Sequence, residues 1–167
     1  MKTIGLLYSK STAYTAELGE RIAAAWGEGI EYVDIDTARL EDVEKHSALI
    51  LGTPTYFNGE LPSAWSEFLP EVEDADFMGK KVAIYGPGDQ VGSPVSFADG
   101  VGILAEFFEA LGAEIVGRTS EEGYSYEQSL AAREGFFLGL ILDPTNQPEL
   151  TDRRLSAWVK ELKSELV

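Results

Sequence analysis

The chain has 167 residues, of which 44% are apolar, and these values predict one packed domain spanning residues 1–167. It has no cysteine and a single histidine, which excludes disulfides, thiolate chemistry, cysteine-ligated metals and a multi-histidine metal site. The formal net charge of −16, from 29 acidic and 13 basic residues, argues against nucleic-acid binding through phosphate contacts. No apolar stretch approaches the roughly 18 residues that span a bilayer, and no secretory signal is present. We therefore expect a cytoplasmic protein without membrane insertion.

Short apolar runs alternate along the chain with segments of helical periodicity. Nearly continuous apolar runs predict buried strands at 3–8, 31–35, 48–51 and 81–85, and the start of a fifth strand at 114–116. Apolar residues at helical spacing predict helices around 18–26, 40–43, 61–69, 101–111 and 155–166. We expect Pro62 and Pro70 to bound the third helix and Thr151 to cap the last one. His46 is expected in a surface turn, without a catalytic role.

This alternation predicts an α/β fold, a three-layer sandwich with helices on both faces of a five-stranded parallel sheet. The doubly wound strand order 2-1-3-4-5 fits five strands and five helices. Residues 117–136 are polar, and an apolar run resumes at 137–142. We interpret this pattern as one edge strand, the fifth, that is split by an insertion.

Ligands of such folds bind at the carboxyl ends of the strands, where three loops begin here, at 9–15, 52–62 and 86–97. The first loop is rich in hydroxyl groups and leads into a helix N-terminus, which attracts anions. It predicts a phosphate site, although a Ser/Thr-rich turn that only caps a helix would have the same composition. Lys10 either pairs with that phosphate or points to solvent. The candidate residues of this loop are Ser9, Lys10, Ser11, Thr12, Ala13, Tyr14 and Thr15.

The other two loops carry ordered motifs, GTPTYFNGELP at 52–62 and GPGDQVGSPVSF at 86–97. Together with the aromatic and hydroxyl-rich segment 8–15, they resemble the three cofactor loops of the flavodoxins. Glu122-Gly123-Tyr124 and Asn146-Gln147 also fit this family, and the insertion is similar to that of its long-chain members. The resemblance covers essentially the whole chain.

The resemblance implies a flavodoxin-like sandwich that binds FMN and has neither a catalytic residue nor a metal. The protein would be a low-potential one-electron carrier, using the quinone, semiquinone and hydroquinone states of FMN. Besides the first loop, it implies cofactor contacts from Thr53, Pro54, Thr55, Tyr56, Phe57, Asn58, Gly59, Pro87, Gly88, Asp89, Ser93, Ser96 and Phe97. The residue types agree, because Tyr56 offers a ring face, Thr55 and Ser96 offer hydroxyls for the ribityl chain, and Gly88 allows close backbone approach.

Several positions depart from the family pattern. Ser93 stands where the family places a tyrosine that stacks on the outer face of the flavin. We therefore expect an open outer face, unless Phe57, Phe97 or a partner surface covers it. Lys10 and Ala13 replace a Ser or Thr and a Gly, Tyr56 replaces a Trp of many long-chain members, and Thr145 replaces an acid.

Two other functions share this fold class: an FMN-dependent NAD(P)H:quinone oxidoreductase and a signalling receiver, which would need an acidic cluster after the first strand. The resemblance favours the carrier, a monomer whose partners have basic docking faces, such as flavodoxin/ferredoxin-NADP reductase or ferredoxin-dependent oxidoreductases. Between Lys45 and Arg118, Lys80 and Lys81 are the only basic residues. This acidic stretch serves either general solubility or the steering of a basic partner.

Overall fold

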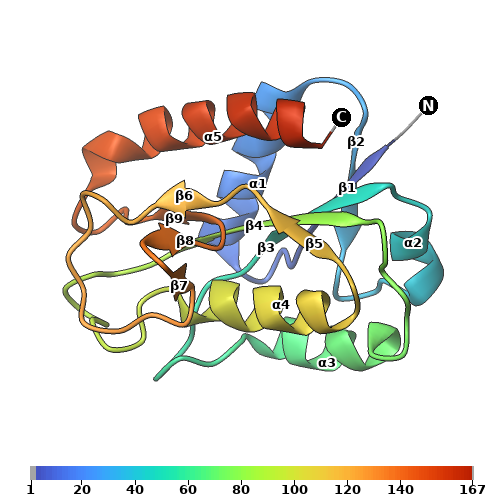
Figure 1. Ribbon diagram of the computed structural model, residues 1–167, viewed down its shortest axis with the longest axis horizontal. Helices are drawn as coiled ribbons and strands as arrows, with labels where there is room; N and C mark the ends of the chain where they lie inside the picture. Colours follow the sequence, from blue (N-terminus) through green and yellow to red (C-terminus); the bar gives the residue numbers. More distant parts are fainter. Residues whose placement is uncertain (1–2, 167) are drawn as a thin grey trace.

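A parallel sheet forms the centre of the molecule in the computed structural model, which describes residues 3–166 (Figure 1). Its strand order is β2-β1-β3-β4-β5, and a further short strand, β9, also pairs with β4. The predicted doubly wound order is therefore confirmed. The strands of this sheet are β1 (Ile4–Tyr8), β2 (Ile30–Asp34), β3 (Ala48–Gly52), β4 (Lys81–Pro87), β5 (Glu114–Val116) and β9 (Leu140–Leu142).

Helices cover both faces of this sheet and create two apolar cores. Figure 1 shows α1 (Ala13–Trp26) and α5 (Thr151–Glu165) on one face, and α3 (Ser63–Val72) and α4 (Asp99–Ala110) on the other. The short α2 (Leu40–Glu44) contributes Val43 to the α3–α4 core. Alternation along β3 feeds both cores, because Leu49 and Leu51 belong to the α3–α4 core and Ile50 to the α1–α5 core.

The three tryptophans of the chain are divided between these cores. Trp65 is buried in the α3–α4 core, and its indole Nε1 donates to the Gly52 carbonyl at 2.9 Å. Trp26 and Trp158 are buried in the α1–α5 core. The Trp158 Nε1 donates to the Gly117 carbonyl at 2.8 Å.

The edge of the sheet is split as the sequence predicts. β5 pairs with residues 81–83 of β4, and β9 pairs with residues 85–87 of the same strand. Gly139 lies where the chain returns to the sheet, and a Cβ there would lie 2.1 Å from the Ile84 carbonyl oxygen. Only glycine allows this close approach of two backbones.

The insertion between the two halves forms a small antiparallel sheet of order β6-β8-β7, which no pattern in the sequence predicts. Its strands are β6 (Thr119–Ser120), β7 (Ala132–Arg133) and β8 (Phe136–Phe137). The inward-facing Phe137 is fully buried in the α3–α4 core. Two-residue strands are too short to show a period-2 pattern in sequence.

His46 is buried, so the expectation of a surface turn is wrong. Its side chain is 1% exposed, and Nδ1 lies 2.9 Å from the Thr3 hydroxyl. The ring occupies the space above Gly5 in β1, where a Cβ would come within 2.8 Å of His46 Cδ2. Burial lowers the pKa of His46. Gly5 thus leaves room for the buried His46 ring, whereas the sequence around His46 predicted an exposed turn.

Two expected helix ends are also wrong. α3 continues through Pro70 to Val72, and the buried Val72 packs in the α3–α4 core. A proline this near the C-terminal end removes one intrahelical hydrogen bond and leaves the helix otherwise intact. Thr151 is the first residue of α5 and makes no capping hydrogen bond, because a 3₁₀ turn (Pro148–Leu150) precedes it.

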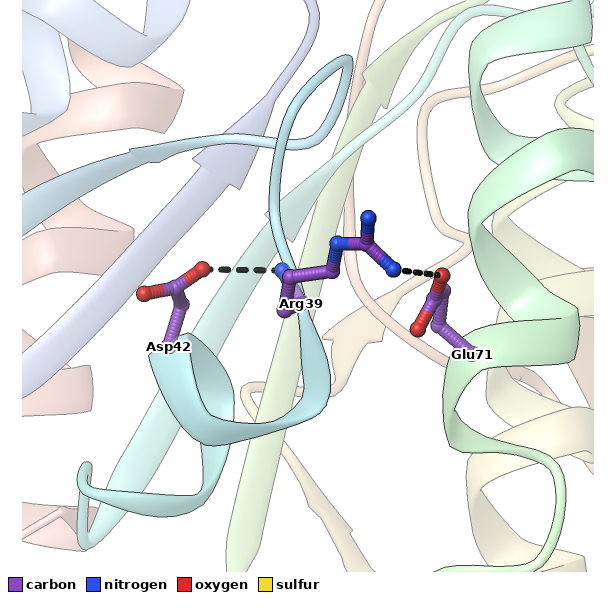
Figure 2. Close-up of polar contacts among 3 residues, drawn as sticks. All are labelled: Arg39, Asp42 and Glu71. Carbon is purple, nitrogen blue, oxygen red and sulfur yellow. Dashed lines mark hydrogen bonds and ion pairs between the residues drawn. The ribbon is translucent and has the colours of Figure 1, made fainter.

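Arg39 ties the start of α2 to α3, as Figure 2 shows. Its backbone N–H donates to the Asp42 carboxylate at 2.8 Å, and the Asp42 N–H donates back to the Arg39 carbonyl at 3.0 Å. The guanidinium lies 3.1 Å from a carboxylate oxygen of Glu71. Because the Arg39 side chain is 67% exposed, solvent screens this ion pair, and the backbone contacts fix the helix start.

Candidate functional site

A cavity of about 200 Å³ opens at the carboxyl ends of β3, β4 and β9. Of the residues predicted from the sequence, it brings together Pro54, Thr55, Pro87, Gly88, Asp89, Ser93 and Ser96. It therefore joins the second and third loops, as expected for a doubly wound sheet.

Three further residues line the cavity, namely Ala98, Pro144 and Thr145. The last two follow β9, so a fourth loop completes the wall. The sequence could have indicated this fourth loop, because the loop after the second half of a split parallel strand also begins at the carboxyl edge of the sheet.

The first loop lies outside this cavity and presents hydroxyl and N–H groups at the start of α1. The first hydrogen bond of the helix runs from the Ala16 N–H to the Thr12 carbonyl at 2.9 Å, so the preceding N–H groups have no acceptor within the helix. The Thr12 hydroxyl donates to the Ser9 carbonyl at 2.7 Å. The Thr15 hydroxyl is buried and has no hydrogen-bond partner in the described structure. An orphaned buried hydroxyl beside free N–H groups suits an anionic ligand.

Two side chains of the first loop turn toward the β2 side. The Ser9 hydroxyl lies 3.0 Å from both carboxylate oxygens of Asp36. The Lys10 ammonium lies 5.3 Å from the centre of the Tyr32 ring, within the range of a cation–π contact. The Lys10 side chain is exposed there and makes no ion pair in the part of the chain that the structure describes.

A tight turn closes the second loop beyond the cavity wall. The Tyr56 and Glu60 backbones exchange two hydrogen bonds of 2.8 Å. Within the turn, Phe57 has a φ of 51° and is 82% exposed, although a bulky side chain rarely adopts this backbone region. Gly59 has a φ of 101°, and a Cβ there would lie 2.7 Å from Asp99 Oδ2. The positive φ favours glycine at this position. Tyr56, Phe57, Asn58 and Gly59, which we call the rim turn, follow the lining residue Thr55 but do not themselves line the cavity. Thr53, which precedes the lining residue Pro54, is buried and does not line it either.

Asp89 organises the third loop around its own carboxylate. That carboxylate accepts hydrogen bonds from the N–H groups of Gly92 at 2.7 Å and Val91 at 3.1 Å, and from Asn146 Nδ2 at 2.8 Å. The hydrogen bonds from Gly92 and Asn146 lower the pKa of Asp89 below its ordinary value. The loop therefore presents an ionised carboxylate at neutral pH next to Gly88 and Ser93.

Phe97 does not reach the cavity with its ring. It is 0% exposed, and its ring stacks on Tyr126 with a centroid separation of 5.2 Å and packs edge-on against Phe137. The Phe97 N–H donates to the Gln128 carbonyl at 3.1 Å. The insertion therefore anchors the end of the third loop through Phe97, and this ring is not available to cover a ligand.

Within residues 3–166, no helix is long and apolar enough to cross a bilayer. The same residues contain no cluster of three or more histidine or acidic side chains arranged to hold a metal ion.

Comparison with known proteins gives a consistent family. The flavodoxin family model matches residues 6–158. A flavodoxin from Synechocystis sp. is 42% identical over 98% of this chain and 97% of its own length, and one from Klebsiella pneumoniae is 38% identical over 99% and 96%. The crystal structure of Fusobacterium nucleatum flavodoxin bound to flavin mononucleotide superposes with a TM-score of 0.92, at 36% identity and 99% coverage of both chains. The chain therefore belongs to the flavodoxin family.

Proposed function

We propose that this chain binds one FMN at the four loops and carries electrons between redox proteins. The observation that carries the proposal is the pairing of a cavity at the carboxyl ends of β3, β4 and β9 with an anion-binding helix start at α1. Family membership supports this reading, and the similar Fusobacterium nucleatum protein binds flavin mononucleotide.

The start of α1 suits the phosphate of FMN. The buried Thr15 hydroxyl has a free hydrogen, and the N–H groups before Ala16 point to the same end of the helix. Lys10 packs on Tyr32 and is not required, because backbone N–H groups and hydroxyls can bind a phosphate without a cation.

The cavity suits the ribityl chain and the flavin ring. Thr55 Oγ1 accepts a hydrogen bond from the Gly100 N–H at 2.9 Å, which leaves its own hydrogen free for a ligand hydroxyl. Ser96 adds a second hydroxyl, and Pro54, Pro87 and Pro144 form apolar walls. Tyr56, at 39% exposure beside the cavity, offers a ring face for stacking.

When bound, FMN supplies reversible electron transfer, and the protein supplies binding, orientation and electrostatics. The curated relatives named flavodoxin support a carrier over a quinone-reducing enzyme of related fold. Redox proteins are the partners of such a carrier. We further propose that those partners present basic docking faces and that the chain works as a monomer; a cytoplasmic location stays a prediction.

The phosphate assignment is tested by calorimetric titration of the FMN-free protein with FMN and with riboflavin. Thr15→Val removes the orphaned hydroxyl at nearly constant volume, and we expect FMN affinity to fall about tenfold while riboflavin affinity stays the same. Thr151→Val is the matched control, because Thr151 Oγ1 is also buried without a partner in the first turn of a helix, but outside the four loops. Absence of FMN binding, or an equal loss for both ligands, would contradict the proposal.

A further inference from the structure

Asp143 is a buried carboxylate directly behind the cavity wall. It follows β9 and precedes the cavity-lining residues Pro144 and Thr145. Its exposed fraction is 0%, the lowest of the acidic side chains in residues 3–166. Burying an ionised carboxylate is costly unless hydrogen bonds compensate, so the position requires an explanation.

Two residues surround this carboxylate with N–H donors. Gln90 donates its backbone N–H to Asp143 Oδ2 at 3.0 Å and its side-chain Nε2 to the same oxygen at 2.7 Å. Asn146 donates its backbone N–H to Oδ1 at 2.9 Å and its Nδ2 to Oδ2 at 2.9 Å and to Oδ1 at 3.1 Å. Burial alone would raise the pKa of Asp143, but these hydrogen bonds lower it below its ordinary value. The carboxylate is therefore ionised at neutral pH.

The same contacts connect the two walls of the cavity. Gln90 directly follows Asp89, which lines the cavity, so its two bonds to Asp143 hold the third loop. Asn146 Nδ2 also donates to Asp89 Oδ1 at 2.8 Å, which ties the third loop to the fourth. One buried carboxylate thus holds both sides of the cavity.

We propose that Asp143 is a positioning residue for the flavin ring and lowers the redox potential of the bound flavin. This inference rests on the proposed function. Its hydrogen bonds hold the third and fourth loops at a fixed separation, so that the ring enters a preformed slot. Its charge lies behind the wall in a region of low dielectric, where it opposes the addition of electrons to the ring.

Asp143→Asn removes the charge at constant size and turns one amide donor toward the donors of Gln90 or Asn146. Because the effect falls on the ring end of the site, we expect the affinities for FMN and riboflavin to fall by the same factor, between about tenfold and a hundredfold. This result differs from that of Thr15→Val, which affects FMN alone. The midpoint potential of the bound flavin should rise. Asp74→Asn is the charge-matched control, because Asp74 is exposed and lies after α3, outside the site.

The potential is the readout that a merely structural role would not move, and two further measurements test the hydrogen bonds themselves. Amide hydrogen exchange of Gln90 in the FMN-free protein should be faster in Asp143→Asn than in the native chain, because its N–H loses a charged acceptor. Asn146→Ala changes an exposed side chain and should weaken riboflavin binding in the same direction, even if Asp143→Asn does not fold.

Failure of the inference is distinguishable from failure of the proposed function. If the native protein does not bind FMN, the proposed function is wrong. If it binds FMN, but the Asp143 and Asn146 variants match Asp74→Asn in riboflavin affinity and in potential, Asp143 is not a positioning residue.

Discussion

Ser93 leaves one side of the cavity without an aromatic cover. It lines the cavity with a partly exposed side chain, at the position where the family resemblance implies a stacked tyrosine. Neither Phe97 nor Phe57 lines the cavity. Phe97 is buried in the core, and Phe57 extends from the rim turn at 82% exposure. The third proposed cover, a partner surface, lies outside this chain.

Ser93→Tyr is therefore expected to strengthen FMN binding. Stacking contributes about 0.5–1.5 kcal/mol beyond area burial, and riboflavin should gain the same amount because the contact is with the ring. The potential of the bound flavin should fall, since a ring that excludes water disfavours the negative charge of the reduced flavin. Calorimetry and a reductive titration measure both effects, with Ser93→Ala as the control. Unchanged affinity and potential in the tyrosine variant would show that the outer face is not open.

His46 gives the stability of the fold a specific pH dependence. Burial lowers its pKa in the folded state, so the unfolded chain binds the proton more readily. The stabilisation is complete above the unfolded pKa of about 6.5 and declines as the pH falls below it. Urea unfolding of the native chain at pH 7 and at pH 5.5 should therefore show a lower free energy of unfolding at pH 5.5. A His46→Gln variant with the same difference between the two pH values would refute this assignment.

At the scale of elements, the buried strands could be predicted from the sequence, whereas the edge of the sheet could be predicted only in part. β3 and β4 are nearly continuous apolar runs, which is typical of parallel strands covered on both faces. The split edge followed from the interrupted apolar run. The small sheet in the insertion could not be predicted, because its strand pairing depends on the burial of Phe137 in the core and not on a local sequence pattern.

The candidate site shows the same division. Seven of the cavity-lining residues were predicted from the loops that follow complete strands. Pro144 and Thr145 follow the three-residue β9 and were missed. Asp143 was missed as well, because a single aspartate next to a proline resembles an ordinary turn. The individual cofactor contacts and the single-domain assignment stay predictions.

At the scale of the whole molecule, the acidic residues between positions 46 and 79 form an exposed set along α3 and its flanking turns. The set comprises Glu60, Glu67, Glu71, Glu73, Asp74 and Asp76, and each of these side chains is exposed. Arg39 pairs with Glu71, and the other five make no ion pair in the described part of the chain. Glu60 directly follows the rim turn, so this charge extends to the candidate site.

Electron transfer from the reduced, FMN-loaded protein to a basic haem protein such as cytochrome c should slow as salt is added. Exposed charges are screened beyond about 8 Å at physiological ionic strength, so attraction before contact is lost. Stopped-flow measurement of the second-order rate at increasing ionic strength tests this, with an uncharged quinone as the control acceptor. A rate that stays constant for the basic acceptor would favour general solubility as the role of the acidic set.

The division of the tryptophans between the two cores makes each helical layer separately visible by fluorescence. A chain in which phenylalanine replaces Trp26 and Trp158 emits only from Trp65, between the sheet and the α3–α4 layer. A Trp65→Phe chain emits only from the α1–α5 layer. Coincident denaturation curves from the two chains would mean that both layers unfold in one cooperative step, and separated curves would identify the layer that opens first.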